Sequence, residues 1–391
     1  MKKMPAIVAL VAVFTLAICL IILGSISTEL MEALGINSGQ FGTLVTALFL
    51  TSCIVQLITG PIVDKIGHKP VAVIGFASVS ISMFILAFAS GFSTALIACI
   101  ILGIGAMSVN TVGNTLIPVV LFGGKDPARA SNFGNGFFGI GYILIPLLIV
   151  FIIKTLGLSY NTALIIIAVL CILFMVLALI TSFPVATTGF KFSRAVKLLL
   201  NPAVIIAALA MFCYTSLESS VTTWIKKLME ELFSISSNTD ASARAGVVLS
   251  FFGVAMMAGR FLTSSIKNLT AIGTKVITFS TILAIISIIF MIIAKGPAVG
   301  IIGVILAGIA FAPIFPTIIG VTFSKFEPGL YGSIFGIVFA TGLLGGTFVP
   351  KLIGNLSVGS TVQQSLYVAL FISLALLVIS LFIARVKNRE S

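Results

Sequence analysis

The sequence contains little charge. Of its 391 residues only 8% are Asp, Glu, Lys or Arg, whereas 59% are hydrophobic, and the mean hydropathy is +1.29. A soluble protein of this length needs a more highly charged surface, so the composition excludes that class and indicates a polytopic membrane protein. The chain also has a single His and no intramembrane group of nucleophile, base or metal ligands. This argues against an enzyme, a metal site or a cofactor.

Acidic residues are scarcer than basic ones. Ten Asp and Glu stand against 22 Lys and Arg, which gives a net charge of +12. The basic residues lie in the short connections between apolar runs, which is the positive-inside pattern of membrane proteins and excludes nucleic acid as the expected partner. The five cysteines lie inside apolar runs without paired or metal-like spacing, so we interpret them as small core residues.

Twelve apolar runs reach the roughly 20 residues that a helix needs to cross a bilayer. The chain is therefore predicted to be an all-α, multi-pass membrane protein, and short loops favour a monomer in a bacterial inner membrane. Sixteen of the 22 Lys and Arg residues lie on the side of the N-terminus, which places both termini in the cytoplasm. The predicted spans are 5–27, 39–61, 70–91, 94–119, 131–154, 160–183, 203–227, 242–265, 274–294, 297–321, 331–354 and 363–385.

The longest predicted cytoplasmic connection, residues 184–202, follows the sixth span. Its "FKFSRAVKLLLNP" alternates basic and apolar residues, as an interfacial helix does. It separates a six-helix bundle over 1–183 from a second one over 203–391. The fifth and eleventh spans share a Gly-x4-Pro pattern, "GYILIP" and "GGTFVP". Two pseudo-symmetric bundles with a substrate site near the midplane are typical of alternating-access carriers.

The stretch "GPIVDKIGHKP" stands between the second and third spans. It resembles the signature of the major facilitator superfamily, which has a Gly, an Asp, a second Gly and basic residues at this spacing. The resemblance implies the twelve-helix major facilitator fold. In that family the cluster helps to hold the outward-open state through contacts with neighbouring helix ends. A conformational role therefore falls to Gly60, Asp64, Lys65, Gly67 and Lys69. We interpret His68 as a solvated charge.

A partial copy of this signature, "GRFLTSSIKN", lies in the second half. Gly259 and Arg260 match the family pattern, which gives Arg260 a conformational role, but Asn268 stands where the family has an acid. This departure weakens the charge cluster expected there. In the tenth span, Pro313 and Pro316 remove backbone hydrogen bonds and are predicted to kink the helix, as a gating hinge or for structural reasons alone.

The stretch "CYTSLESSVTTW" in the seventh span resembles the fucose/glucose:proton symporter branch of this superfamily, with Tyr214, Glu218 and Trp224 at the matching positions. "ARASNFGNGFFGIGYILIP", "APIFP" and "FATGLLGGTFVPKLIG" are similar to that branch too. The resemblance implies transport of a sugar together with protons. The branch also keeps acids in its first and fourth spans, which this chain lacks, so its full proton relay does not carry over. The drug-efflux branch has a Gly-Pro dipeptide in its fifth span; here the Gly and the Pro are separated.

Glu218 is the only charged residue between Pro202 and Lys226. An ionised carboxylate in a membrane helix costs roughly 2–3 kcal/mol, so we predict that it binds and releases the coupled proton. If Trp224 anchors the helix at the outer interface, Glu218 lies about 9 Å inside that boundary. The alternatives are a Glu that serves only as a hydrogen-bonding post and a Trp that stacks on a sugar.

The remaining substrate-binding candidates are carboxamides. Asn110 and Asn114 are four residues apart and share one helix face, and Gln56 lies in the second span. Carboxamides supply the mixed donors and acceptors that sugar hydroxyls need. The alternative is a polar contact between helices, worth on the order of 1 kcal/mol.

Together these features predict a secondary carrier for a small polar solute, most simply a sugar, driven by protons across the lipid bilayer. A passive uniporter and a proton-driven efflux carrier for amphiphilic compounds are the alternatives within transport. Abundant Phe and Met, 32 and 11 residues, favour the efflux carrier because they form adaptable apolar cavities. From another class, a membrane sensor that does not transport is the remaining alternative.

Overall fold

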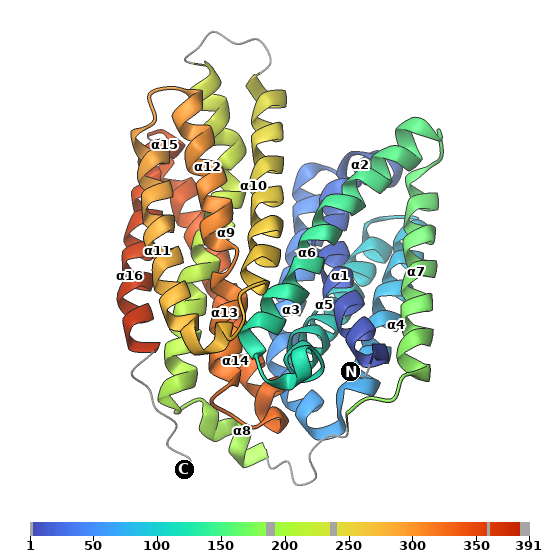
Figure 1. Cartoon of the computed structure of the whole chain (residues 1–391). Helices are drawn as coiled ribbons and strands as arrows, with labels where there is room; N and C mark the ends of the chain where they lie inside the picture. Colours follow the sequence, from blue (N-terminus) through green and yellow to red (C-terminus); the bar gives the residue numbers. More distant parts are fainter. Residues whose placement is uncertain (1–2, 185–191, 235–240, 358–359, 384–391) are drawn as a thin grey trace. The chain divides into compact units, whose positions relative to one another are not determined.

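The computed structural model describes residues 3–184, 192–234, 241–357 and 360–383. In these ranges twelve helical segments are long and apolar enough to cross a membrane, which confirms the predicted number (Figure 1). The first six are α1 (Lys3–Ser25), α3 (Ser38–Ile66), α4 (His68–Ala87), α5 (Phe92–Val120), α6 (Pro127–Val150) and α7 (Tyr160–Ile180), with the short α2 (Ser27–Leu34) after α1. The chain continues through α8 (Phe192–Leu198), α9 (Pro202–Ser234), α10 (Ala241–Ser264), α11 (Leu269–Ile293), α12 (Pro297–Phe311), α13 (Ile314–Phe323), α14 (Tyr331–Ser357), α15 (Val362–Ser365) and α16 (Tyr367–Ile383).

Local sequence signals set several helix ends. Asn37 and Gln40 form a capping box at the start of α3, in which each side chain accepts from the other residue's backbone N–H. Ser159 caps α7, and Pro297 occupies the first turn of α12, where its missing N–H costs nothing. The turn between α3 and α4 is a single residue, Gly67, at φ +85°, a conformation that favours glycine. This turn therefore explains the second Gly of the signature.

The chain forms two compact units. The first contains Met1–Gly124, Phe137–Ala195 and Pro328–Gly336. Its centre is α5, which packs against α1, α3 and α4, and α4 in turn packs against α7. Most residues of α5 are buried, including the polar run from Ser108 to Thr115. The interior of this unit is thus polar along one helix that the sequence marks as strongly apolar.

The second unit contains Lys125–Gly136, Val196–Glu327 and Ile337–Ser391. Here α9 packs against α10, α12, α13 and α16, and α11 packs against α12, α13 and α16 (Figure 1). Three helices contribute to both units: α6 gives its first turns to the second unit, α14 gives its first turns to the first, and the short α8 is divided after Ala195. The division of the chain at 184–202 stays a prediction.

Two spans differ in detail from their apolar runs. The tenth span is broken as predicted: α12 ends at Phe311, Ala312 and Pro313 separate the two pieces, and α13 begins at Ile314. The seventh span is longer than predicted, because α9 continues seven residues past position 227 to Ser234. Its last turns carry Lys226, Lys227, Glu230 and Glu231, which end the apolar run without ending the helix.

The contact between α4 and α5 depends on small residues. A methyl group added at Gly105 would meet Val79 Cγ2 at 2.7 Å and Val79 N at 2.8 Å. We expect Gly105→Ala to lower the free energy of unfolding by about 1–3 kcal/mol, because the backbone of α4 has to move. Gly42→Ala in α3 is the matched control: nothing lies within 4 Å of its added methyl, so stability should rise by up to about 1 kcal/mol. Unfolding of the purified protein in detergent measures both, and equal effects would contradict this packing.

Candidate functional site

The central feature of the second unit is an ion pair between α9 and α10. Arg260 Nη2 lies 3.7 Å from Glu218 Oε1. The Arg260 side chain is 4% exposed and that of Glu218 is 25% exposed, so the guanidinium is the more deeply buried partner. A buried charge in a membrane protein needs such a partner, since an unpaired one is costly.

Arg260 makes two further bonds that fix its position. Its Nε donates to Ala312 O at 3.3 Å, and its Nη1 donates to Asn135 O at 3.2 Å. Ala312 precedes Pro313 at the break of the tenth span, where carbonyls lose their helical partners. Arg260 therefore touches the acid of α9, the break between α12 and α13, and the first turns of α6; its conformational role stays a prediction.

Tyr214 lies one turn before Glu218 on α9 and is fully buried. Its ring stacks against Phe315, with centroids 6.2 Å apart, and meets the edge of Phe311 at 6.4 Å. Its hydroxyl lies beside Glu218 and Arg260. The sequence pattern of Tyr214 and Glu218 is thus realised as one cluster, with Arg260 as the member that sequence reasoning did not pair with the acid.

The depth of Glu218 below the outer boundary of the membrane stays a prediction, but the structure fixes its place along α9. Because α9 runs from Pro202 to Ser234, sixteen residues precede Glu218 and sixteen follow it. At 1.5 Å per residue the carboxylate lies about 24 Å from either end of the helix. The charged residues beyond Trp224 belong to the same helix, so Trp224 does not mark where α9 ends.

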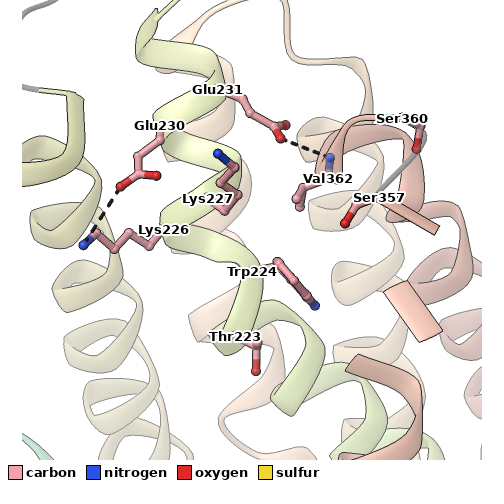
Figure 2. Close-up of a pocket in the computed structure, with 9 residues that line it drawn as sticks. All are labelled: Thr223, Trp224, Lys226, Lys227, Glu230, Glu231, Ser357, Ser360 and Val362. Carbon is pink, nitrogen blue, oxygen red and sulfur yellow. Dashed lines mark hydrogen bonds and ion pairs between the residues drawn. The ribbon is translucent and has the colours of Figure 1, made fainter. Parts of the chain in front are cut away.

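Trp224 packs between helices. Its Nε1 donates to Pro350 O at 3.0 Å, and its ring covers Gly354 on α14. It also lines a cavity of about 590 Å³, drawn in Figure 2, together with Thr223, Lys226, Lys227, Glu230, Glu231, Ser357, Ser360 and Val362. Figure 2 shows the Lys226–Glu230 ion pair and the bond from Val362 N to Glu231 in its wall. Trp224 and Glu218 share α9, but Glu218 does not line this cavity.

The carboxamide candidates of the first unit bond to one another. Asn114 Nδ2 donates to Asn110 Oδ1 at 2.8 Å, and Asn110 Nδ2 donates to Gln56 Oε1 at 3.2 Å. Gln56 Nε2 in turn donates to Thr111 Oγ1 at 3.3 Å. All four side chains are at most 2% exposed. In this structure they tie α3 to α5; the role of Gln56, Asn110 and Asn114 in substrate binding stays a prediction.

The signature between α3 and α4 is built around a buried carboxylate. Asp64 accepts from Gly332 N at 2.8 Å, from Ser333 N at 2.7 Å and from Ser333 Oγ at 2.6 Å, at the first turn of α14. Gly60 lets the two helices meet, since a methyl group there would strike Gly332 O. Asp64 therefore contacts a neighbouring helix end, as the resemblance implies.

The basic residues of the signature differ in exposure. Lys65 and Lys69 are exposed, as solvated charges should be. The interpretation of His68 as a solvated charge is wrong, because the side chain is half-buried and its Nε2 lies 3.0 Å from Thr115 Oγ1 on α5. Sequence reasoning missed this pair because it joins residues of two different helices, and Thr115 carries no motif of its own.

Comparison with known proteins identifies the family. Residues 7–350 match the model of the Major Facilitator Superfamily, and the chain belongs to that family. It is a multi-pass membrane transporter of this family rather than an enzyme. Of the described helices, those from α2 to α13 and most of α1 and α14 lie inside the matched range.

Solved structures share the fold over nearly the whole chain. FucP, a Major Facilitator Superfamily transporter in the outward conformation, superposes with a TM-score of 0.80 at 17% identity and covers 97% of this chain and 98% of its own. The human organic anion transporter MFSD10 (TM-score 0.76, 16% identity, 97% and 99% covered) and the proton:xylose symporter XylE (TM-score 0.73, 13% identity, 98% and 95% covered) are also similar. At such identities the likeness concerns the fold.

Among curated proteins, the quinolone resistance protein NorA of Staphylococcus aureus is 29% identical over 118 residues. The match spans 30% of this chain and 30% of NorA. It does not extend to the remaining length of either protein, so NorA's own activity enters below only as an alternative.

The Glu218–Arg260 pair makes unequal contributions to stability. We expect Arg260→Gln to lower the free energy of unfolding by about 2–4 kcal/mol, because Glu218, Asn135 and Ala312 all lose a charged donor. Glu218→Gln should cost less, about 1–2 kcal/mol, because the amide oxygen can still accept from the buried guanidinium, which loses only its counter-charge. Lys226→Gln, which breaks the exposed Lys226–Glu230 pair, is the control and should change stability by less than about 0.5 kcal/mol. Denaturation in detergent micelles measures all three, and an Arg260→Gln effect no larger than the control would refute the network.

Proposed function

We propose that this transporter moves a small polar organic solute, most simply a sugar, by alternating access, and that protons drive it through Glu218. The observation that carries the proposal is the Glu218–Arg260 pair at the middle of α9, with one partner buried and the other a quarter exposed. The sugar:proton symporters among its structural neighbours support the solute class. We also propose that the protein is a monomer, and that it lies in a bacterial inner membrane, since its relative NorA is bacterial.

The pair suggests how one acid manages coupling without acids in the first and fourth spans. Ionised Glu218 attracts Arg260 across 3.7 Å, and protonated Glu218 does not. Arg260 keeps its bonds to Asn135 O and Ala312 O in either case, so the proton changes the attraction to Glu218 and leaves these two bonds in place. A proton on Glu218 thereby loosens α9 from α10 beside the broken tenth span, where Pro313 and Pro316 serve as a hinge.

We choose residues for the substrate site from the polar and aromatic candidates. We assign Glu218 and Tyr214 to it, with Trp224 farther along α9. Gln56, Asn110 and Asn114 of the first unit remain substrate-binding candidates, provided that their mutual bonds open during transport. Each of these bonds is a carboxamide pair that a sugar hydroxyl can replace donor for donor and acceptor for acceptor.

Transport into proteoliposomes with an imposed pH gradient tests the coupling. Fucose and xylose are the first solutes to test. The unmodified protein should concentrate its solute, and Glu218→Gln should only equilibrate it while still exchanging labelled for unlabelled solute, because the substrate path stays open without a titrating group. Glu230→Gln on the same helix is the matched control and should concentrate normally.

The outcomes separate the alternatives. Normal accumulation by Glu218→Gln would remove the proton role of Glu218. If the unmodified protein equilibrates a sugar and never concentrates it, the protein is a passive uniporter. If it moves no solute at all, the result favours a membrane sensor that does not transport.

A second candidate function rests on the match with NorA. Efflux of amphiphilic compounds would use the same acid in antiport, and the 32 Phe residues would supply an adaptable lining. Loading the same liposomes with a fluorescent amphiphilic cation distinguishes the two. Under the sugar proposal the dye distribution does not respond to the pH gradient; under the efflux alternative it responds and Glu218→Gln abolishes the response.

A further inference from the structure

Asp126 lies next to Asn268, at the start of α11, where the partial signature lacks its acid. Asn268, which stands at that signature position, directly precedes α11, adopts φ +57° and makes no side-chain cap to the helix. The first N–H groups of α11 therefore need another acceptor. Asp126 provides it: Oδ2 accepts from Leu269 N at 3.0 Å, and Oδ1 accepts from Thr270 N at 2.9 Å and from Thr270 Oγ1 at 2.6 Å.

The same carboxylate also begins its own helix. Asp126 Oδ1 accepts from Arg129 N in the first turn of α6, at 3.3 Å. Thr270 returns a bond in the opposite direction, because its Oγ1 accepts from Ala128 N at 2.9 Å. Asp126 is 7% exposed, so two helix N-termini share one buried carboxylate. A negative charge between two positive helix ends is favourable to both.

The positively charged Arg129 lies at the C-terminus of α10. Arg129 Nε donates to the backbone oxygen of Ser264, the last residue of α10, at 2.8 Å. The start of α6 thus presents an acid to the N-terminus of α11 and a base to the C-terminus of α10, which matches the polarity of each helix. Close packing accompanies it, since a methyl group on Gly320 of α13 would strike the backbone of Ala128.

This arrangement parallels the one at Asp64. There an acid at the end of α3 receives two backbone N–H groups and one hydroxyl from the first turn of α14, beside the glycine contact of Gly60 and Gly332. Asp126 receives the same three donors from the first turn of α11. The difference is the helix that carries the acid: in the signature it ends the second span, and here it begins the fifth.

We propose that Asp126, Arg129 and Thr270 form a second conformational clamp, the Asp126 clamp, in which Asp126 replaces the acid missing at Asn268. The clamp holds the first turn of α6 to the start of α11 in the state seen here, and it opens when the transporter changes state. Asp126 acts as a positioning residue. This role does not depend on which solute is carried or on proton coupling at Glu218.

Distance measurements between spin labels test the clamp directly. Labels at Lys125→Cys and Lys275→Cys, both exposed positions, report on the separation of α6 and α11 in a background without the five native cysteines. The unmodified background should show a dominant short distance. Asp126→Asn should raise the ratio of long to short distances about fivefold, because the neutral side chain is a weaker acceptor for two helix ends.

Two further variants give the result its specificity. Thr270→Val removes the hydroxyl without changing the shape and should shift the ratio in the same direction, whereas Thr270→Ser should not. Asn268→Gly, which keeps the positive φ, should leave the distribution unchanged. A thermal midpoint for each variant shows that the protein is folded, and a structural role alone would move this midpoint without moving the distance ratio.

The contrary results are equally definite. An unchanged distance ratio in folded Asp126→Asn overturns the proposal, as does a shift in Asn268→Gly as large as that in Asp126→Asn. If Asp126→Asn does not fold, Thr270→Val against Thr270→Ser decides: equal distributions for these two overturn the clamp.

Discussion

A helix end buried in a membrane protein exposes backbone N–H groups that water and lipid cannot satisfy, and this constraint organises both units. Asp64 supplies the acceptor for the start of α14 in one unit, and Asp126 supplies it for the start of α11 in the other. Each carboxylate is more than nine-tenths buried. Each acid therefore ties two helices of its own unit together at a helix N-terminus.

The buried polar groups of this chain fall into two kinds. In the first unit, Gln56, Asn110 and Asn114 satisfy one another and are closed to solvent. In the second, Glu218 lies 3.7 Å from Arg260 and beside the Tyr214 hydroxyl, and its side chain stays a quarter exposed. Fully satisfied polar networks rigidify a structure, whereas a charged group with a loose partner can change protonation without dismantling its surroundings. A change of protonation therefore fits Glu218 better than it fits the carboxamide network.

Apolar length sufficed to predict twelve spans, and two prolines sufficed to predict that the tenth is interrupted. The limits of α9 were missed because Lys226 to Glu231 end the hydropathy while preserving helix-forming residues. At the site, Tyr214 and Glu218 lie one turn apart and were found together, but Arg260 was not paired with them, since that contact joins separate helices. His68 was misread for the same reason: its partner Thr115 is remote in sequence. Local patterns predict elements and neighbours along one helix, and contacts between helices need the fold.

Asn268 is the instructive case, because its reading by motif alone was incomplete rather than false. The motif loses its acid there, yet the helix that follows still starts on a carboxylate. What the fold requires is a negative charge at the N-terminus of α11, and any segment that meets this terminus can carry it. The start of α6 meets it and carries Asp126, with Thr270 bonding in both directions. A family signature can therefore lack its acid while a carboxylate from another segment accepts from the same helix terminus. In this chain Asp126, and not residue 268, carries that carboxylate.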